Sequence, residues 1–138
     1  MDIRISTENG RVPVTVMHVD GNIDANSYDQ FQSRAEELIE GGARHILIDL
    51  SNSPFVSSAG LRALHHLFNK LRAKDTNSPL SEEEVRRGIS AGTYKSPHLK
   101  LLNLSKETKT AFELSGFDMF IATFDDRQAA LDSFQTAG

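Results

Sequence analysis

One stretch of this sequence decides the fold: Asp49-Leu-Ser-Asn-Ser-Pro-Phe-Val-Ser-Ser-Ala-Gly-Leu61, which joins a β-type segment to a helical one. Residues 45–50 form a short apolar run, which is typical of a central β-strand covered on both faces. After the stretch, apolar residues recur at spacings of three and four, which predicts a helix over about residues 57–73. Ser57 and Ser58 stand where this helix begins, and a hydroxyl or a phosphate there can bind its unpaired N–H groups. The segment is therefore a candidate switch.

The segments before this stretch predict a hairpin and a helix. Apolar residues alternate with polar ones over residues 3–19 on either side of a turn at 8–11, which favours two antiparallel strands. A helix is expected from about Tyr28 to the glycine pair at 41–42, with Asp24 or Asn26 as its N-terminal cap.

The segments after it predict further strand–helix pairs. Strands are expected over residues 99–104 and 119–124, followed by helices capped by Ser105 and Asp125. The first of these helices is expected to turn three residues inward, namely Ala111, Phe112 and Leu114. Such alternation implies right-handed crossovers and mostly parallel strands. The predicted fold class is α/β: an N-terminal β-hairpin, then alternating α and β elements that form a small mixed sheet covered by helices.

The length of 138 residues predicts a single domain, 1–138. Residues 74–97 differ from their surroundings, because they hold two of the four prolines and their charges cancel. We interpret them as an insertion within the domain, after the second main helix. Ser81 and Glu84 match a capping box, which predicts a short helix around residues 82–87.

Composition narrows the classes of function. The net charge is −4 without a basic patch, so nucleic acid is not the expected partner. The absence of cysteine excludes disulfides, thiolate metal sites and a cysteine nucleophile. No apolar run approaches the ~20 residues of a membrane span, and the N-terminus lacks a signal-peptide pattern. We expect a cytoplasmic protein that does not insert into membranes.

The motifs of enzymes and cofactor sites are missing from the sequence. No glycine-rich nucleotide motif occurs, and the adjacent His65 and His66 would point about 100° apart on a helix, so they cannot easily chelate one ion. The context of Ser58 is not a nucleophile elbow, since glycines are lacking where that turn needs them. Asp49 could orient a base, yet no histidine lies near it in sequence. We therefore predict no enzyme, no catalytic residue, no cofactor and no metal; a hydrolase using Ser58 is a third hypothesis that lacks a base.

Four segments together resemble the STAS domain family (sulfate transporter and anti-sigma factor antagonist). Residues 19–24 are similar to the family's G-x-[IL]-D strand end, residues 43–51 to its central strand and residues 55–61 to its S-S-A-G-L signature. Residues 114–117 are similar to the end of its third helix. The resemblance covers nearly the whole chain apart from the insertion.

The resemblance implies an anti-sigma factor antagonist. Such proteins bind an anti-sigma factor that is also a serine kinase, which releases the sigma factor and permits transcription. The kinase then phosphorylates the serine two positions before the Gly-Leu pair, here Ser58, and a phosphatase restores binding. Ser57 is the second choice for this site, and Asp24 matches a family aspartate close to the phosphorylated serine. The partner-binding residues implied by the family are Asp24, Ser57, Ser58, Ala59, Gly60 and Leu61.

Two readings of the serines stay open. A phosphate adds about −1.5 to −2 charges, and with Asp24 nearby, and Asp49 as a second candidate, repulsion would break a docked interface. Alternatively the serines only cap the helix, at a cost of about 1 kcal/mol when removed. The alternative function is a STAS module that binds proteins or a small ligand without phosphorylation, as a stress-complex scaffold, a lipid-transport accessory subunit or a transporter-associated subunit. The identity of the anti-sigma factor and the oligomeric state also stay open.

Overall fold

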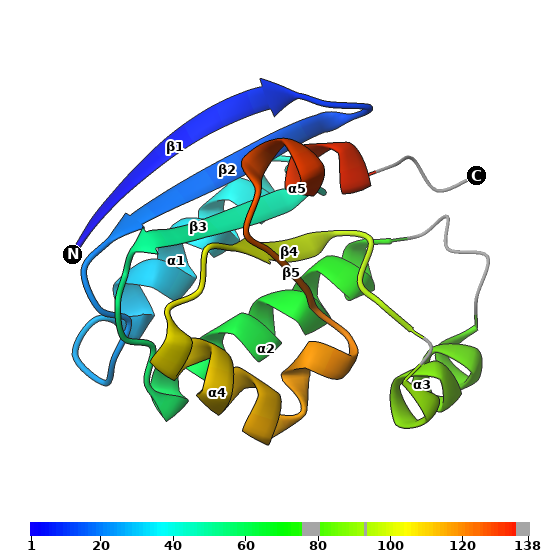
Figure 1. Cartoon of the computed structure of the whole chain (residues 1–138). Helices are drawn as coiled ribbons and strands as arrows, with labels where there is room; N and C mark the ends of the chain where they lie inside the picture. Colours follow the sequence, from blue (N-terminus) through cyan, green and yellow to red (C-terminus); the bar gives the residue numbers. More distant parts are fainter. Residues whose placement is uncertain (76–80, 93, 135–138) are drawn as a thin grey trace.

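A five-stranded β-sheet forms the centre of the computed structural model, which describes residues 1–75, 81–92 and 94–134 (Figure 1). The strands are β1 (Asp2–Asn9), β2 (Pro13–Asp20), β3 (Ile46–Asn52), β4 (Leu99–Leu102) and β5 (Ala122–Phe124). They lie side by side in sequence order, with β1 antiparallel to β2 and all other neighbours parallel. The predicted hairpin and the mostly parallel mixed sheet are confirmed.

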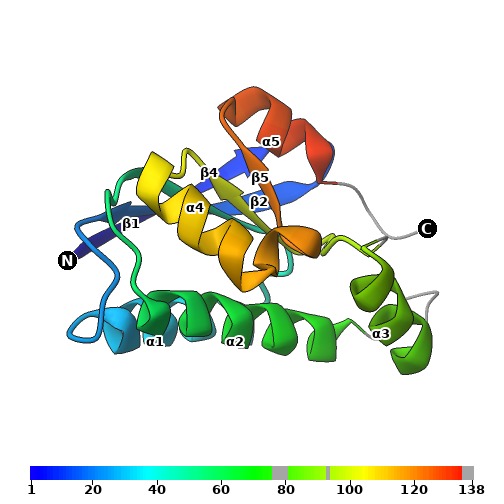
Figure 2. The ribbon, with the colours of Figure 1, turned by 60° about the horizontal axis from the view of Figure 1, so that its bottom comes forward.

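Helices cover the two faces of this sheet unequally (Figures 1 and 2). The helices are α1 (Tyr28–Glu40), α2 (Ser58–Lys74), α3 (Glu82–Ala91), α4 (Lys106–Ser115) and α5 (Arg127–Ser133), with a 3-10 turn at Phe117–Met119. On one face, α1, α2 and α4 contribute to the larger apolar cluster, whereas α5 contributes to the smaller cluster on the other face. The predicted α/β fold class, a small sheet covered by helices, is confirmed.

Strand β3 shows why the central apolar run is continuous. Ile46, Ile48 and Leu50 pack into the cluster on the α1/α2 face, while Leu47 packs into the cluster under α5. All four are essentially inaccessible to solvent, so each contributes about 1.5–3 kcal/mol of hydrophobic stabilisation. A strand buried on both faces needs apolar residues at consecutive positions.

Side-chain caps fix where three helices begin. The Ser57 hydroxyl accepts a hydrogen bond from the Gly60 N–H at the start of α2, and the Ser105 hydroxyl accepts one from Thr108 at the start of α4. At α3 the predicted capping box is present, and the helix extends to Ala91, beyond the expected end at residue 87. Residues 76–80 and 93 of the expected insertion lie outside the described residues, and its status as an insertion stays a prediction.

The predicted cap of α1 is wrong. Ser27 occupies the N-cap position without a side-chain capping bond. The Asp24 carboxylate instead accepts hydrogen bonds from the Asn26 N–H (2.9 Å) and the Ser27 hydroxyl (3.2 Å), which closes a turn before the helix. An aspartate can satisfy the backbone two residues ahead of it in a turn as readily as at a helix end.

The C-terminal region also differs from the prediction in three details. The last strand starts at Ala122, because residues 117–119 form a 3-10 turn. Asp126, rather than Asp125, caps α5 by accepting from the Ala129 N–H at 3.0 Å. Leu114 is 84% exposed, since the inward face of the short helix α4 is formed by Thr108 and Phe112, four residues apart.

Candidate functional site at the start of α2

Two loops meet beside the start of α2. The Ile23 N–H donates to the Phe55 carbonyl at 3.0 Å, and the Ser57 N–H donates to the Ile23 carbonyl at 2.8 Å. Ile23 and Val56 thereby form an isolated parallel β-bridge. This pairing places the loop that carries Asp24 alongside the residues that lead into α2.

Gly60 allows this close approach. A Cβ atom at this position would lie 2.6 Å from Val56 Cγ1 and 2.7 Å from the Ile23 carbonyl oxygen, and Cβ atoms do not approach other atoms so closely. The first turn of α2 therefore packs directly on the bridge between the two loops. Leu61, the next residue, is buried in the main core.

The two serines occupy different environments. Ser57 is half-buried at the N-cap, in an extended conformation, and its hydroxyl lies 3.4 Å from the Gly60 nitrogen that it caps. Ser58 is the first residue of α2 and is exposed. Its hydroxyl lies at the positive end of the helix dipole, where no residue of the first turn is acidic.

Exposed apolar and aromatic groups lie next to Ser58. Phe55, three residues before it, is 49% exposed, and Tyr28 at the start of α1 is 38% exposed. A hollow of about 210 Å³ lies between α1 and α2, lined by Ala25, Tyr28, Gln32, Ala59, Arg62 and Ala63. Exposed aromatic side chains and arginine are enriched at protein–protein interfaces. Sequence patterns did not select Phe55 or Tyr28, although Phe55 follows a proline in a loop, which is a signal of exposure.

The structure brings together the residues that the resemblance implied, but in two layers. Asp24 and Ser57 are half-buried and Ser58 is exposed, so these three contribute to the surface. Ala59 and Leu61 are each only 8% exposed, and Gly60 is buried between them. The buried residues hold the surface in place rather than form it.

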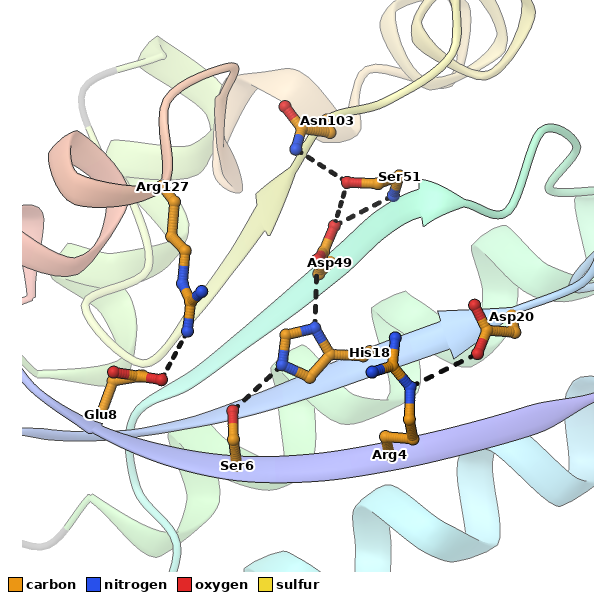
Figure 3. Close-up of polar contacts among 9 residues, drawn as sticks. All are labelled: Arg4, Ser6, Glu8, His18, Asp20, Asp49, Ser51, Asn103 and Arg127. Atoms are coloured by element: carbon orange, nitrogen blue, oxygen red, sulfur yellow. Dashed lines mark hydrogen bonds and ion pairs between the residues drawn. The ribbon is translucent and has the colours of Figure 1, made fainter.

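Asp49 does not belong to this site, which corrects the expectation of a second negative charge near Ser58. Its side chain lies on the sheet face of Leu47, opposite to α2, and pairs with His18 at 3.1 Å (Figure 3). Side chains alternate between the two faces along a strand, so the burial of Ile48 and Leu50 toward α2 directs Asp49 away from it.

Metal sites and membrane spans are not found in the described part of the chain. Over residues 1–75, 81–92 and 94–134, no three His, Asp or Glu side chains are grouped as metal ligands would be. None of the described helices has the length and hydrophobicity needed to cross a bilayer.

Known proteins similar to this chain include several that are named as anti-sigma factor antagonists. BtrV of Bordetella bronchiseptica, inferred to be an anti-sigma factor antagonist, is 24% identical over 117 residues, which cover 85% of this chain and 83% of BtrV. A structure from Thermotoga maritima, also inferred to be such an antagonist, has a TM-score of 0.71 at 12% identity, covering 96% of this chain and 93% of that one. The Bacillus cell fate determinant SpoIIAA in its phosphorylated form has a TM-score of 0.60 at 17% identity, covering 95% and 97%.

A family model matches the part of the chain that contains the start of α2. The model of the STAS domain matches residues 5–87, from β1 into α3. That range is more than half of the chain, and it includes Asp24, Ser57 and Ser58. The chain belongs to the STAS domain family.

Proposed function

We propose that this protein is an anti-sigma factor antagonist that docks on its partner through the surface at the start of α2 and is released when Ser58 is phosphorylated. The observation that carries the proposal is the exposed Ser58 at the first position of α2, beside the loop that holds Asp24. The antagonist names of similar proteins support the same role, and one of these proteins, SpoIIAA, also has a structure in a phosphorylated form.

Electrostatics would make Ser58 an effective switch. The neutral hydroxyl adds little to a surface that displays Phe55 and Tyr28, so a partner can bury it at low cost. A phosphate adds about −1.5 to −2 charges at the start of α2, next to the loop that carries the Asp24 carboxylate. The free N–H groups at the start of α2 favour an anion, so the helix itself tolerates the phosphate. Repulsion then acts on the partner, and a coupling of about 1–3 kcal/mol changes affinity roughly 5- to 150-fold.

Ser58 is a better acceptor than Ser57 on geometric grounds. The Ser57 hydroxyl is used as the cap of α2, and its residue is half-buried. A kinase needs to reach the hydroxyl, and Ser58 is the more exposed of the two. Ser57 is therefore the second candidate.

The role requires partners but no catalysis by this chain. The partner is an anti-sigma factor with serine kinase activity, and a phosphatase restores the unmodified form, in the bacterial cytoplasm. Binding sequesters the anti-sigma factor and frees the sigma factor. The surface residues assigned to binding are Asp24, Ser57 and Ser58, supported from below by Ala59, Gly60 and Leu61.

The test is calorimetric titration of the cognate anti-sigma factor with purified variants. Ser58→Ala should bind as tightly as the wild type, whereas Ser58→Glu should bind at least about tenfold more weakly because it adds a charge at the surface. Ser33→Glu is a matched control, since it adds the same charge at an exposed position of α1. The alternative, a STAS binding module that is not phosphorylated, predicts little effect from either change at Ser58. Wild-type affinity in Ser58→Glu would therefore contradict the switch.

A further inference from the structure

Three side chains from three adjacent strands form a hydrogen-bonded chain on the sheet face opposite to α2 (Figure 3). The Ser6 hydroxyl on β1 lies 3.0 Å from His18 Nε2 on β2. His18 Nδ1 lies 3.1 Å from Asp49 Oδ2 on β3. The order hydroxyl, imidazole and carboxylate, through these same ring nitrogens, is the one by which serine hydrolases activate their nucleophile.

The carboxylate determines the direction of these hydrogen bonds. An ionised Asp49 only accepts, so the proton of a neutral His18 must reside on Nδ1. Nε2 then carries the lone pair and accepts from the Ser6 hydroxyl. His18 is thus oriented as a base for Ser6.

A second layer of hydrogen bonds holds Asp49. Its Oδ1 accepts from both the N–H and the hydroxyl of Ser51, and the Ser51 hydroxyl accepts from Asn103 Nδ2 at 2.8 Å. Burial raises the pKa of the Asp49 carboxyl, but the hydrogen bonds from Ser51 and His18 lower it by more, so the net pKa lies below its usual range. The carboxylate is therefore ionised at neutral pH.

Asn103, which donates to Ser51, lies in the left-handed region with a φ of 59°, the one positive value at a non-glycine residue in the described chain. Asparagine adopts this conformation more readily than other side chains. Asn103 follows the carboxyl end of β4, and Ser51 lies near the carboxyl end of β3, which is the edge where open parallel sheets carry their sites.

Ser6 is half-buried on this open face, and Arg4 is carried by the same strand. Helix α5 covers the apolar part of this face, and the side chains of His18 and Asp49 each keep 18% exposure. Arg4 lies two residues before Ser6, on the same face of β1, and is the cross-strand neighbour of His18. Its side chain is 66% exposed, and its Nε lies 3.5 Å from Asp20 Oδ2, toward the end of β1 that is away from Ser6.

From this geometry we infer that Ser6 is an activated nucleophile that accepts one acyl group from an activated donor such as an acyl phosphate or an aryl ester. Ser6 Oγ forms a bond to the carbonyl carbon while His18 Nε2 takes the hydroxyl proton. The bond from that carbon to the leaving oxygen then breaks, and the proton passes from His18 to that oxygen. The product is a neutral ester on Ser6, on the sheet face remote from Ser58, so the modification is separate from the proposed switch.

The probe for this inference is p-nitrophenyl acetate, added to the full-length protein. Acetylation is located by mass spectrometry of the tryptic peptide 5–11, with fragmentation to separate Ser6 from Thr7. We expect Ser6 to be acetylated about a hundredfold faster than Ser33, an exposed serine on α1, because base catalysis contributes at least that much.

Variants assign the roles. Ser6→Ala should lose the fast acetylation and Ser33→Ala should keep it. His18→Gln removes the base, and Asp49→Asn offers Nδ1 a donor instead of an acceptor, so each should slow the reaction at Ser6 at least about tenfold while circular dichroism shows a folded protein. Acetylation of Ser6 no faster than that of Ser33, or a rate at Ser6 that is unchanged in folded His18→Gln, would overturn the inference. Neither result bears on binding through Ser58.

Discussion

The two faces of the sheet differ in how they are covered and in which side chains they carry. The face toward α1, α2 and α4 is packed by one continuous apolar cluster, and the start of α2 is set on it through Gly60. Among the described residues, the other face carries the seven-residue helix α5 and a smaller cluster. Charged and polar side chains occupy the rest of it, including the chain from Ser6 to Asp49. The packed face positions the candidate docking surface, and the open face leaves room for polar chemistry.

Lys100 illustrates how the α5 face accommodates charge. It is only 8% exposed, and its Nζ donates to the carbonyl and the hydroxyl of Ser133, each at 3.0 Å. The same nitrogen lies 4.9 Å from the centre of the Phe134 ring, a cation–π contact. Burial lowers the pKa of this ammonium group. A lysine therefore fastens α5 to the sheet, whereas its neighbours on β4, Leu99 and Leu101, pack into the apolar cluster on the opposite face.

The largest expected effect comes from removing the same side chain on either face. Leu64→Ala on α2 should lower the free energy of unfolding by about 3–5 kcal/mol, because the rigid cluster around it cannot close the cavity. Leu131→Ala on α5 should lower it by about 2–3 kcal/mol, since a short helix can shift inward. Urea denaturation measures both. An equal or larger loss at Leu131 would show that the two faces are packed alike.

A smaller loss is expected where α2 meets the loops. Gly60→Ala should cost about 1–3 kcal/mol, because the added Cβ displaces the bridge between Ile23 and Val56. Ser58→Ala, two residues earlier, is the matched control and should change stability by less than about 0.5 kcal/mol, because its side chain is exposed. If both variants unfold at the wild-type urea concentration, the proposed close packing of this turn is wrong.

The smallest effect concerns the polar network of the open face, and it depends on pH. The pKa of Asp49 is lower in the folded protein than in the unfolded chain, so its ionisation stabilises the fold at neutral pH and above the unfolded value of about 4. This contribution, about 1 kcal/mol, is lost as the pH falls through the lower, folded value. Asp49→Asn should therefore be less stable than the wild type at pH 7, and the difference should shrink in strong acid. Thermal unfolding of both proteins across this pH range measures the difference. A difference in stability that stayed constant with pH would show that the ionisation of Asp49 does not stabilise the fold.

Much of the packed face could be predicted from the sequence, because it depends on local patterns. The apolar run over residues 45–50 predicted β3, and the helical spacing after it predicted α2; the structure confirms both elements. Predictions failed where few residues carried the pattern. Leu114 lies on a ten-residue helix with only two buried residues, so the spacing did not determine which side faces inward.

The open face could not be predicted, because its contacts depend on register between distant strands. His18 meets Asp49 only because β2 and β3 pair in parallel with these two residues side by side. No histidine lies near Asp49 along the sequence, so the local pattern does not predict a catalytic base beside it. The contact between Ser6 and His18 could have been predicted more easily, because the turn of the hairpin limits the register of β1 against β2. In the observed register Arg4 lies opposite His18, and Ser6 is its diagonal neighbour.

The proposal that phosphorylation of Ser58 controls partner binding is tested most directly by phosphosite mapping. Mass spectrometry would be applied to the protein isolated from its native cells, during growth and under stress. We expect phosphate on Ser58, with an occupancy that differs between the two conditions. Phosphate on Ser57 would support the same mechanism with the site one residue earlier. Absence of phosphate from both serines in both conditions would contradict the switch and favour a STAS domain that binds its partner constitutively.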